Sequence, residues 1–252
     1  MSSGAALAAR CGSGAGGFEA WMADFRQKAR AQGISEATLK RALDGVTYDH
    51  AVIARDRSQK SFKLDFNTFY QRRVGTYLVE KARGKMRSHA GLLAGIEKRY
   101  GVPKEILVSI WGLETNFGAD GAGKYSIIRS IATLAYDCRR SDFFQPHLMA
   151  AMRIVQKGDM SPGEMRGGWA GEIGQVQFLP GSYDKYAVDQ DGNGRRDLVH
   201  SVPDILASTA NFMKSHGWQA GQPWGPGTAN YAVIKEWNKA DVYARTIALM
   251  AE

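Results

Sequence analysis

Apolar residues at helical spacing dominate the first two thirds of the chain and set its fold class. In the stretch FEAWMADFRQKARAQG, apolar side chains stand at positions 18, 21, 22, 25 and 29, and Gly33 ends the pattern. The same spacing continues through SEATLKRALDG, where Ser35 is a candidate N-cap, through residues 65–101, and through three further stretches up to residue 157. These patterns predict a mainly α-helical fold.

Two regions interrupt the helical pattern. Residues 46–61 show no helical spacing and are predicted to form a loop, and residues 159–237 are rich in glycine and turn residues. Within the second region, Ser161 and Glu164 form a capping box that predicts a short helix, and VPDILASTANFMKSHG predicts a longer one. The stretch WQAGQPWGPGTANYAVIKEW is predicted to be irregular. Irregular segments in a helical protein often carry its function.

The formal charge of +8 favours polyanionic partners, either nucleic acid or an acidic cell wall. The basic residues are spread along the chain, and no nucleic-acid-binding signature is present, so solvated surfaces are the favoured interpretation. No apolar run is long enough to span a bilayer. The opening residues, MSSGAALAAR, lack the basic segment of a signal peptide, which predicts either a cytosolic protein or the mature part of an exported one.

Glu114 is the one carboxylate in the apolar helical stretch SIWGLETNFG. It falls on the same face of the predicted helix as Leu107, Ile110 and Trp111. Burial and a place in the last turn of a helix both disfavour negative charge, and both raise the pKa of a carboxyl group. A raised pKa suits a general acid at neutral pH. The alternative is an exposed glutamate at a frayed helix end, and this stretch alone leaves both interpretations open.

The stretch GGWAGEIGQVQFLPGSY combines small residues, amides and aromatic rings. Small residues allow close approach of the backbone to a ligand, and Gln175 and Gln177 offer uncharged donors and acceptors. Trp169, Phe178 and Tyr183 offer flat apolar faces. This combination suits a sugar that carries N-acetyl groups. A packed loop with the glutamines at the surface is the alternative.

The stretch DQDGNGRRD matches the first half of an EF-hand calcium loop. Asp189, Asp191 and Asn193 stand at alternate positions before a glycine. The second half departs from the pattern, because His200 occupies the position of the usual bidentate glutamate. Asp204 is the nearest carboxylate that could close a longer loop. A solvated acidic turn is the alternative interpretation.

The two cysteines, Cys11 and Cys138, are far apart in the sequence. In an oxidising compartment we expect a disulfide that ties the N-terminal segment to the rest of the protein. In the cytosol two unpaired residues are expected instead. The cysteine count alone does not decide between these compartments.

Five segments occur in a characteristic order: IWGLETNFG, WAGEIGQVQFLPGSY, DQDGNGRRDL, ASTANFMKSHGW and NYAVIKEWNKADVYA. With these segments the chain resembles the B-type lytic transglycosylases, bacterial murein-cleaving enzymes with a lysozyme-like core. The resemblance implies a mainly α fold with a lysozyme-like core, an additional N-terminal helical lobe, and a Gly-rich and EF-hand-like loop region. It suggests an irregular extension over residues 1–17, the helical lobe over 18–95 and the catalytic core over 96–252, with the C-terminal helix packed back on the lobe.

The family cleaves the β-1,4 bond between N-acetylmuramic acid and N-acetylglucosamine without water and leaves a 1,6-anhydromuramoyl end. The resemblance implies that Glu114 is the single acid and base of this reaction and that no cofactor takes part. Ordinary glycosidases need a second carboxylate, whereas here the N-acetyl oxygen and the C6 hydroxyl of the substrate would fill its roles.

The resemblance also assigns binding residues. Substrate contacts are implied for Tyr70, Gln177, Trp237, Asn238 and Tyr243, and Asn238 is a candidate helix N-cap as well. A calcium site is implied for Asp189, Asp191, Asn193, the carbonyl of Arg195, and Asp204, with sodium or no ion as the alternatives.

By the same resemblance the protein is expected in the periplasm, where a Cys11–Cys138 disulfide would form. The sequence LAARC is a poor lipobox because Arg10 precedes the cysteine, so a soluble protein is favoured over a lipid-anchored one. Glycan strands of peptidoglycan are the expected partner, other cell-wall enzymes are candidate partners, and neither nucleic acid nor a transmembrane segment is expected.

Two departures from the family pattern support an alternative function. Gly168 stands where relatives often have a serine near the catalytic glutamate, and the stretch from Trp218 to Tyr231 is shorter than expected. Both features motivate a non-catalytic peptidoglycan-binding or scaffold protein. A hydrolytic muramidase is the alternative within the enzymes, and nucleic-acid binding, suggested by charge alone, ranks last.

Overall fold

The computed structural model describes residues 11–59, 64–121 and 123–252, and it confirms a mainly α-helical fold. Residues 1–10, which include most of the predicted irregular extension and the lipobox-like sequence before Cys11, lie outside the described residues. None of the described helices is long and apolar enough to cross a membrane. The elements are α1 (Phe18–Ala31), α2 (Glu36–Leu43), α3 (His50–Ser58), α4 (Phe66–Arg73), α5 (Gly75–Ser88), α6 (Ala90–Tyr100), α7 (Lys104–Thr115), β1 (Tyr125–Ser126), α8 (Ile127–Tyr136), α9 (Ser141–Lys157), β2 (Arg166–Gly167), α10 (Pro180–Tyr186), α11 (Val202–Ser215), α12 (Ala229–Trp237) and α13 (Asp241–Met250).

Many of these helices start at an N-cap residue whose side chain accepts a hydrogen bond from the first turn. The hydroxyl of Ser35 accepts a hydrogen bond from the backbone N–H of Thr38, so the predicted N-cap of α2 is confirmed. Asp65, Ser126 and Ser201 cap α4, α8 and α11 in the same way. Each cap satisfies a backbone donor that the first helical turn leaves unpaired, and this fixes where the helix starts.

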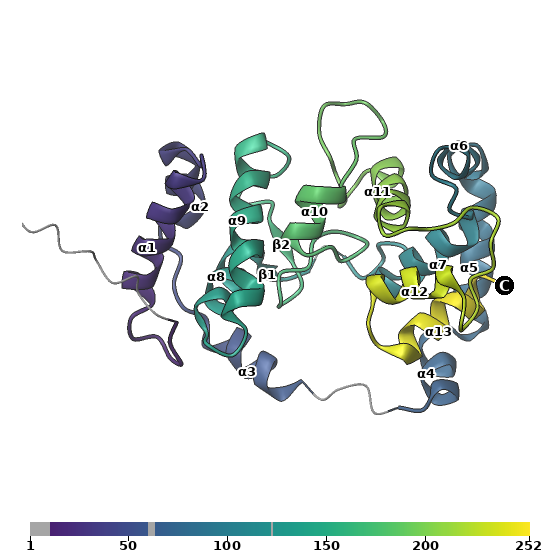
Figure 1. Cartoon of the computed structure of the whole chain (residues 1–252), viewed down its shortest axis with the longest axis horizontal. Coiled ribbons are helices and arrows are strands. Elements are labelled where there is room, and N and C mark those ends of the chain that lie inside the picture. Colours follow the sequence, from purple (N-terminus) through teal and green to yellow (C-terminus); the bar gives the residue numbers. More distant parts are fainter. Residues whose placement is uncertain (1–10, 60–63, 122) are drawn as a thin grey trace, which may run out of the picture. The chain divides into compact units, whose positions relative to one another are not determined.

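The chain divides into two compact units, and the first contains residues Met1–Gln59, Gly123–Ile173 and Phe178–Asp184. In this unit α8 and α9 lie side by side, α1 and α3 contact α8, and α2 contacts α9 (Figure 1). A cluster of buried aromatic rings, Phe18, Trp21, Tyr48 and Tyr136, joins α1 to α8. The short strands β1 and β2 form an antiparallel pair.

Cys11 and Cys138 form a disulfide in this first unit, which confirms the predicted bridge. Backbone hydrogen bonds flank it, from the N–H of Gly12 to the carbonyl of Tyr136 and from the N–H of Cys138 to the carbonyl of Gly12, both 3.0 Å long. A Cβ atom at position 12 would lie 2.0 Å from the Tyr136 hydroxyl, so only glycine fits there. The segment after Cys11 is therefore held against the end of α8.

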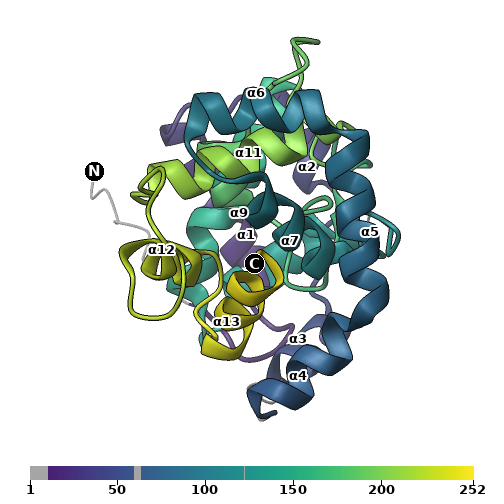
Figure 2. The same cartoon turned by 90° about the vertical axis from the view of Figure 1, so that its right-hand side faces the viewer.

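The second unit contains residues Lys60–Ala122, Gly174–Gln177 and Lys185–Glu252 and is built around α7. Helices α5, α6, α11 and α13 all contact α7 (Figure 2). From Ile106 to Thr115 every residue of α7 is buried except Glu114, which is half-buried. The apolar pattern around Glu114 therefore marks the central helix of this unit.

Two local predictions are wrong. The loop predicted over residues 46–61 contains α3, because Asp49 caps its first turn and the buried carboxylate of Asp56 pairs with Arg139 and Arg140. The irregular segment predicted before residue 238 contains α12, which Thr228 caps. Both helices are stabilised by polar contacts that apolar spacing does not show.

Two further details also differ. Ser161 and Glu164 make both hydrogen bonds of a capping box, but they enclose a turn, because the chain becomes extended at Arg166 to pair as β2. Asn238 is not an N-cap. It ends α12, and its side-chain oxygen accepts a hydrogen bond from the N–H of Ala240, one residue before α13 begins.

His147 on α9 makes the stability of the first unit depend on pH. Its Nδ1 atom accepts a hydrogen bond from the backbone N–H of Gly181, 3.0 Å away, and burial lowers the pKa of His147 from 6.5 to about 4. Between pH 6.5 and 4 the unfolded chain binds a proton that the folded protein does not, so stability is lost as pH falls through this window. At pH 4.5 the expected loss is about 2.5 kcal/mol.

Replacement of His147 by asparagine should remove this dependence. The side-chain oxygen of asparagine accepts the same hydrogen bond but does not titrate. Urea unfolding at pH 7 and pH 4.5 measures the effect, and the variant should lose about 2.5 kcal/mol less than the wild type between these pH values. Equal losses in both proteins would show that His147 does not set this dependence.

Candidate active site

Two hydrogen bonds converge on one oxygen of Glu114 in the last turn of α7. The indole Nε1 of Trp237 lies 2.9 Å from Oε1, and the hydroxyl of Tyr243 lies 2.8 Å from the same atom. Trp237 ends α12 and Tyr243 stands in the first turn of α13, so the two C-terminal helices supply both donors. With two donors at Oε1, a proton on the carboxyl group is compatible with this arrangement only at Oε2.

The hydroxyl of Tyr243 is suited to remain a donor. Burial and the nearby charge of Glu114 raise the pKa of Tyr243 well above its usual value, while Arg73 opposes the shift. The ring of Phe69 packs on Tyr243 with 6.1 Å between centroids. Tyr243 therefore stays protonated at neutral pH and stabilises negative charge on Glu114.

Gln175 is hydrogen-bonded to the C-terminal half of α7. Its side-chain oxygen accepts a hydrogen bond from Trp111 Nε1 at 2.7 Å, and its amide nitrogen donates to the carbonyl of Val199 at 2.7 Å. The hydroxyl of Thr115 donates to its backbone carbonyl at 2.6 Å. Both groups of the Gln175 side chain are thus engaged by the fold, and the half-buried residue does not lie free at the surface.

The backbone after Glu114 turns sharply to end the helix. Asn116 and Phe117 have φ angles of 50° and 60°, in the left-handed region that non-glycine residues rarely adopt. Lys81 donates to both the backbone carbonyl and the side-chain oxygen of Asn116, at 3.1 and 2.8 Å. The ring of Phe117 meets Trp111 edge-on at 5.3 Å. These contacts hold a strained turn directly beside Glu114.

Three further predicted substrate residues also lie in the second unit. Gln177 has a φ angle of 54°, and its amide nitrogen donates to the carbonyl of Gly174 at 2.8 Å. Tyr70 is half-buried beside Phe66. Within the described part of the chain, the side-chain nitrogen of Asn238 has no hydrogen-bond acceptor, so it remains able to donate to a ligand.

Gly168 is explained by Glu172, in the first unit. A Cβ atom at position 168 would lie 2.1 Å from a carboxylate oxygen of Glu172, so a serine there would require the Glu172 side chain to move. The same oxygen accepts a hydrogen bond from the N–H of Ala170 at 3.0 Å. Burial raises the pKa of Glu172. Glycine at position 168 therefore leaves room for the Glu172 carboxylate in its present position.

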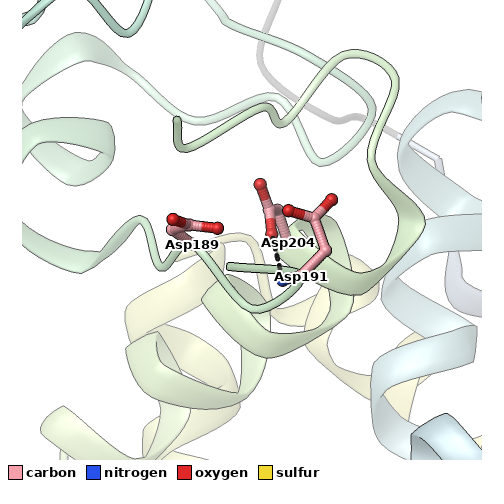
Figure 3. Close-up of side chains that lie close together, drawn as sticks. All are labelled: Asp189, Asp191 and Asp204. Carbon is pink, nitrogen blue, oxygen red and sulfur yellow. Dashed lines mark hydrogen bonds between the residues drawn. The ribbon is translucent and has the colours of Figure 1, made fainter. Parts of the chain in front are cut away.

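Three of the five predicted metal ligands come together where the loop after α10 meets the first turn of α11 (Figure 3). One carboxylate oxygen from each of Asp189, Asp191 and Asp204 lies within 4.8 Å of the other two. Asp204 is fully buried and accepts hydrogen bonds from the N–H groups of Gln190 and Asp197, at 2.7 and 2.8 Å. The side-chain oxygen of Asn193 accepts a hydrogen bond from the N–H of Arg195, at 2.9 Å. Asp204 therefore lies beside the two aspartates of the loop.

Comparison with known families decides where this fold belongs. A sequence model described as "Transglycosylase SLT domain" matches residues 17–228. The chain belongs to the B-type lytic transglycosylase family. The family predicted from the five segments is thereby confirmed.

Individual relatives cover different shares of the chain. Membrane-bound lytic murein transglycosylase B of Escherichia coli (strain K12) is 40% identical over 123 residues, which make up 48% of this chain and 34% of that protein. The chain thus spans about a third of the length of this curated relative.

Solved structures of other proteins match the fold of this protein over most of the chain. SltB3 from Pseudomonas aeruginosa, in complex with NAG-anhNAM-pentapeptide, is 34% identical with a TM-score of 0.85, over 93% of this chain and 78% of that one. Lytic transglycosylase Slt35 of Escherichia coli, in complex with calcium, is 23% identical with a TM-score of 0.81, over 91% of each chain. The lysozyme-like fold class is confirmed by these matches.

Proposed function

We propose that this protein is a peptidoglycan lytic transglycosylase that cleaves the β-1,4 bond between N-acetylmuramic acid and N-acetylglucosamine, with Glu114 as its only acid and base. The observation that carries the proposal is the pair of donors, Trp237 and Tyr243, on one oxygen of Glu114. A carboxylate placed in a buried helix and oriented by two donors is built for proton transfer rather than for solvation.

In the first step Glu114 donates its proton to the glycosidic oxygen, the bond from that oxygen to the muramoyl C1 breaks, and N-acetylglucosamine leaves as an alcohol. Positive charge develops at C1, and the N-acetyl oxygen of the same sugar stabilises it by bonding to C1. The anion left on Glu114 is stabilised by the indole N–H of Trp237 and the hydroxyl of Tyr243.

In the second step the carboxylate of Glu114 removes the proton from the C6 hydroxyl of the muramoyl sugar. The C6 oxygen then bonds to C1 and displaces the N-acetyl oxygen, which gives the 1,6-anhydro product and restores the protonated Glu114. No water and no second carboxylate take part. Tyr70, Gln177 and Asn238 are the proposed substrate contacts, and the unpaired side-chain nitrogen of Asn238 is suited to a sugar hydroxyl or N-acetyl oxygen.

Mass spectrometry of the soluble products from purified murein tests the proposal. Muropeptides with 1,6-anhydromuramic ends are the expected result. Reducing muramic ends would instead identify a hydrolytic muramidase. Sedimentation with murein without soluble products would identify a peptidoglycan-binding or scaffold protein. Either of these outcomes overturns the proposed reaction.

Loss of the Trp237 donor should slow the reaction. In Trp237→Phe the ring remains against Phe212, 5.0 Å away in the wild type, but the hydrogen bond to Glu114 is lost. A hydrogen bond to a charged group contributes about 1.5–3 kcal/mol, so we expect a decrease in kcat of about tenfold or more. Trp224→Phe is the control, because it removes an indole bond to the carbonyl of Ala248 instead. A wild-type rate in Trp237→Phe would contradict this role.

The acidic loop fits a calcium ion on the chemistry of its donors. Carboxylate oxygens are the preferred ligands of calcium, and oxygens of Asp189, Asp191 and Asp204 within 4.8 Å of one another match the span of ligands bound at 2.3–2.6 Å. Three carboxylates this close repel one another unless a cation offsets their charge. We propose that these residues hold the ion, with Asn193 and the carbonyl of Arg195 completing the site, and that it stabilises the loop without entering the reaction.

Calcium should therefore raise the stability of the protein. At a free concentration 100 times its Kd, the ion adds about 2.7 kcal/mol to the free energy of unfolding. In Asp191→Asn most of this gain should disappear, whereas Glu19→Gln, an exposed acid on α1, should retain it. Thermal unfolding with calcium and with chelator measures the difference. An equal calcium response in Asp191→Asn and the wild type would place the ion elsewhere.

A periplasmic location completes the proposal. The Cys11–Cys138 disulfide is stable in an oxidising compartment, which the periplasm provides. Murein glycan strands are the proposed binding partner, and the basic charge of the chain suits the carboxylates of their peptides. Interaction with other cell-wall enzymes remains a prediction.

A further inference from the structure

Helices α4 and α13 are in contact in the second unit, and α4 touches the buried Tyr243 at two points (Figure 2). The ring of Phe69 packs on the Tyr243 ring, with 6.1 Å between centroids. Arg73 stands four residues further along α4, on the same face, and its side chain forms a hydrogen bond with the Tyr243 hydroxyl. The mechanism above uses Tyr243 as a donor to Glu114 but assigns no part to Arg73.

The guanidinium group of Arg73 fixes the direction of the hydrogen bond between Tyr243 and Glu114. A guanidinium group carries only donors, so the Tyr243 oxygen must accept from Arg73. The hydroxyl hydrogen of Tyr243 is then left to point at Oε1 of Glu114, 2.8 Å away. A hydroxyl that accepts from a cation also becomes a stronger donor, because hydrogen bonds in a chain polarise one another. The three side chains therefore form a chain of hydrogen bonds that ends on the carboxyl group of Glu114.

Arg73 also holds the last turn of α7, which carries Glu114. In a continuing helix the carbonyl of Leu113 would accept from the N–H of Phe117, but that N–H bonds to the carbonyl of Trp111 at 3.3 Å. The Nη2 atom of Arg73 donates to the Leu113 carbonyl instead, at 2.7 Å. One planar group with several donors thus binds both the turn that carries Glu114 and the tyrosine that donates to it.

The charge of Arg73 acts in the same direction as its hydrogen bonds. The last turn of α7 contains no basic residue, although the backbone dipole at this end of a helix opposes an anion. Arg73 places a positive charge on this turn, and Lys81, which donates to the carbonyl of Asn116 at 3.1 Å, places a second. Both cations stabilise the carboxylate that Glu114 becomes after it has given up its proton.

We infer that Arg73 is a positioning residue for the reaction, which holds the Tyr243 hydroxyl and the last turn of α7 in the arrangement that Glu114 needs for proton transfer. This inference rests on the proposed function, because it adds to the same site a residue that acts through Tyr243 rather than on the substrate. An arginine that acted by contact with the glycan would change KM, whereas one that acts through Tyr243 changes kcat.

A double-mutant cycle on soluble murein glycan strands tests this role. Arg73→Gln should lower kcat about tenfold and leave KM within about twofold, because a hydrogen bond made by a charged group is lost. In Tyr243→Phe, which lacks the hydroxyl, the same change at Arg73 should lower kcat less than about threefold, since the group through which Arg73 acts is already gone. Arg73→Lys keeps the charge without the planar group and should recover part of the activity.

Arg83→Gln is the matched control, because Arg83 is another exposed arginine of the second unit and stands on α5. This variant should keep the kcat and KM of the wild type. Arg73 is exposed as well, so its replacement should leave the protein folded. Urea unfolding of the four proteins of the cycle checks the fold and gives a second measure of the coupling between Arg73 and Tyr243.

The two measurements separate this inference from the proposed function. If the wild type is active and the two changes lower kcat independently, or Arg73→Gln leaves kcat unchanged, the positioning role is overturned and the reaction stands. If the wild type is inactive but the urea midpoints of the cycle are non-additive, the proposed reaction is overturned, while the coupling of Arg73 to Tyr243 stands. Additive midpoints in an inactive protein overturn both.

Discussion

Replacement of Glu114 by glutamine is expected to lower the release of soluble muropeptides from purified murein by about 10³-fold, the usual contribution of a general acid and base. Glutamine has nearly the same shape, and its side-chain oxygen can still accept the hydrogen bonds from Trp237 and Tyr243. It has no acidic proton to give to the glycosidic oxygen, and its amide cannot remove the proton of the C6 hydroxyl. Both steps of the proposed mechanism therefore fail in one variant.

Stability and a matched control separate this effect from misfolding. Glu105 stands in the first turn of the same helix and contacts Lys104 near the surface, so Glu105→Gln removes a carboxylate from α7 without touching the proposed site. Thermal unfolding of Glu114→Gln should stay close to that of the wild type, and Glu105→Gln should retain full activity. Undiminished release of muropeptides by Glu114→Gln would end the assignment of Glu114 as acid and base.

The location of Glu114 is the part of the site that the sequence predicted best. A carboxylate among Leu107, Ile110 and Trp111 at helical spacing has to lie on a buried face, and α7 is indeed buried along this stretch. Local periodicity was sufficient because a helix carries its own register. The alternative interpretation, an exposed glutamate at a frayed helix end, does not describe a half-buried residue that accepts hydrogen bonds from side chains of α12 and α13.

The partners of Glu114 could not be derived from local pattern, because they lie 123 and 129 residues further along the chain. Resemblance to a family pointed to Trp237 and Tyr243, but as substrate contacts. The structure adds that both donate to the carboxylate itself. Gln175 shows the reverse case. Its side-chain amide suggested a contact with a ligand, but in the structure it is hydrogen-bonded to Trp111 and to the carbonyl of Val199. Which polar groups a fold satisfies internally depends on contacts between distant segments.

The helices that the sequence missed share a physical cause. Helix α3 buries only a few side chains, and its position depends on the ion pairs of Asp56 with Arg139 and Arg140. Helix α12 follows a segment rich in glycine and proline, and its start depends on the cap by Thr228. Apolar spacing detects helices that bury one continuous face, so helices defined by caps and long-range ion pairs escape it.

Reduction of the Cys11–Cys138 disulfide is expected to lower the free energy of unfolding by several kcal/mol. The bridge spans 127 residues, and closing a loop of this length in the unfolded chain corresponds to about 5 kcal/mol in the chain-entropy model, with about 2–4 kcal/mol typical of measured bridges. The first unit is made of separate chain segments, and the bridge joins the first, Met1–Gln59, to the second, Gly123–Ile173. In the unfolded state, the bridge therefore limits the conformational freedom of the long stretch of chain between these two segments.

Urea unfolding with and without reductant measures this effect. The Cys11→Ser/Cys138→Ser variant should be as unstable as the reduced wild type, and reductant should not change it further. If the segment around Gly12 simply detached from Tyr136 while the remainder of the unit kept its stability, reduction would leave the unfolding midpoint unchanged. A loss of about 2 kcal/mol or more instead requires that the segment and α8 unfold together with the unit, as the aromatic cluster of Phe18, Trp21 and Tyr136 leads us to expect.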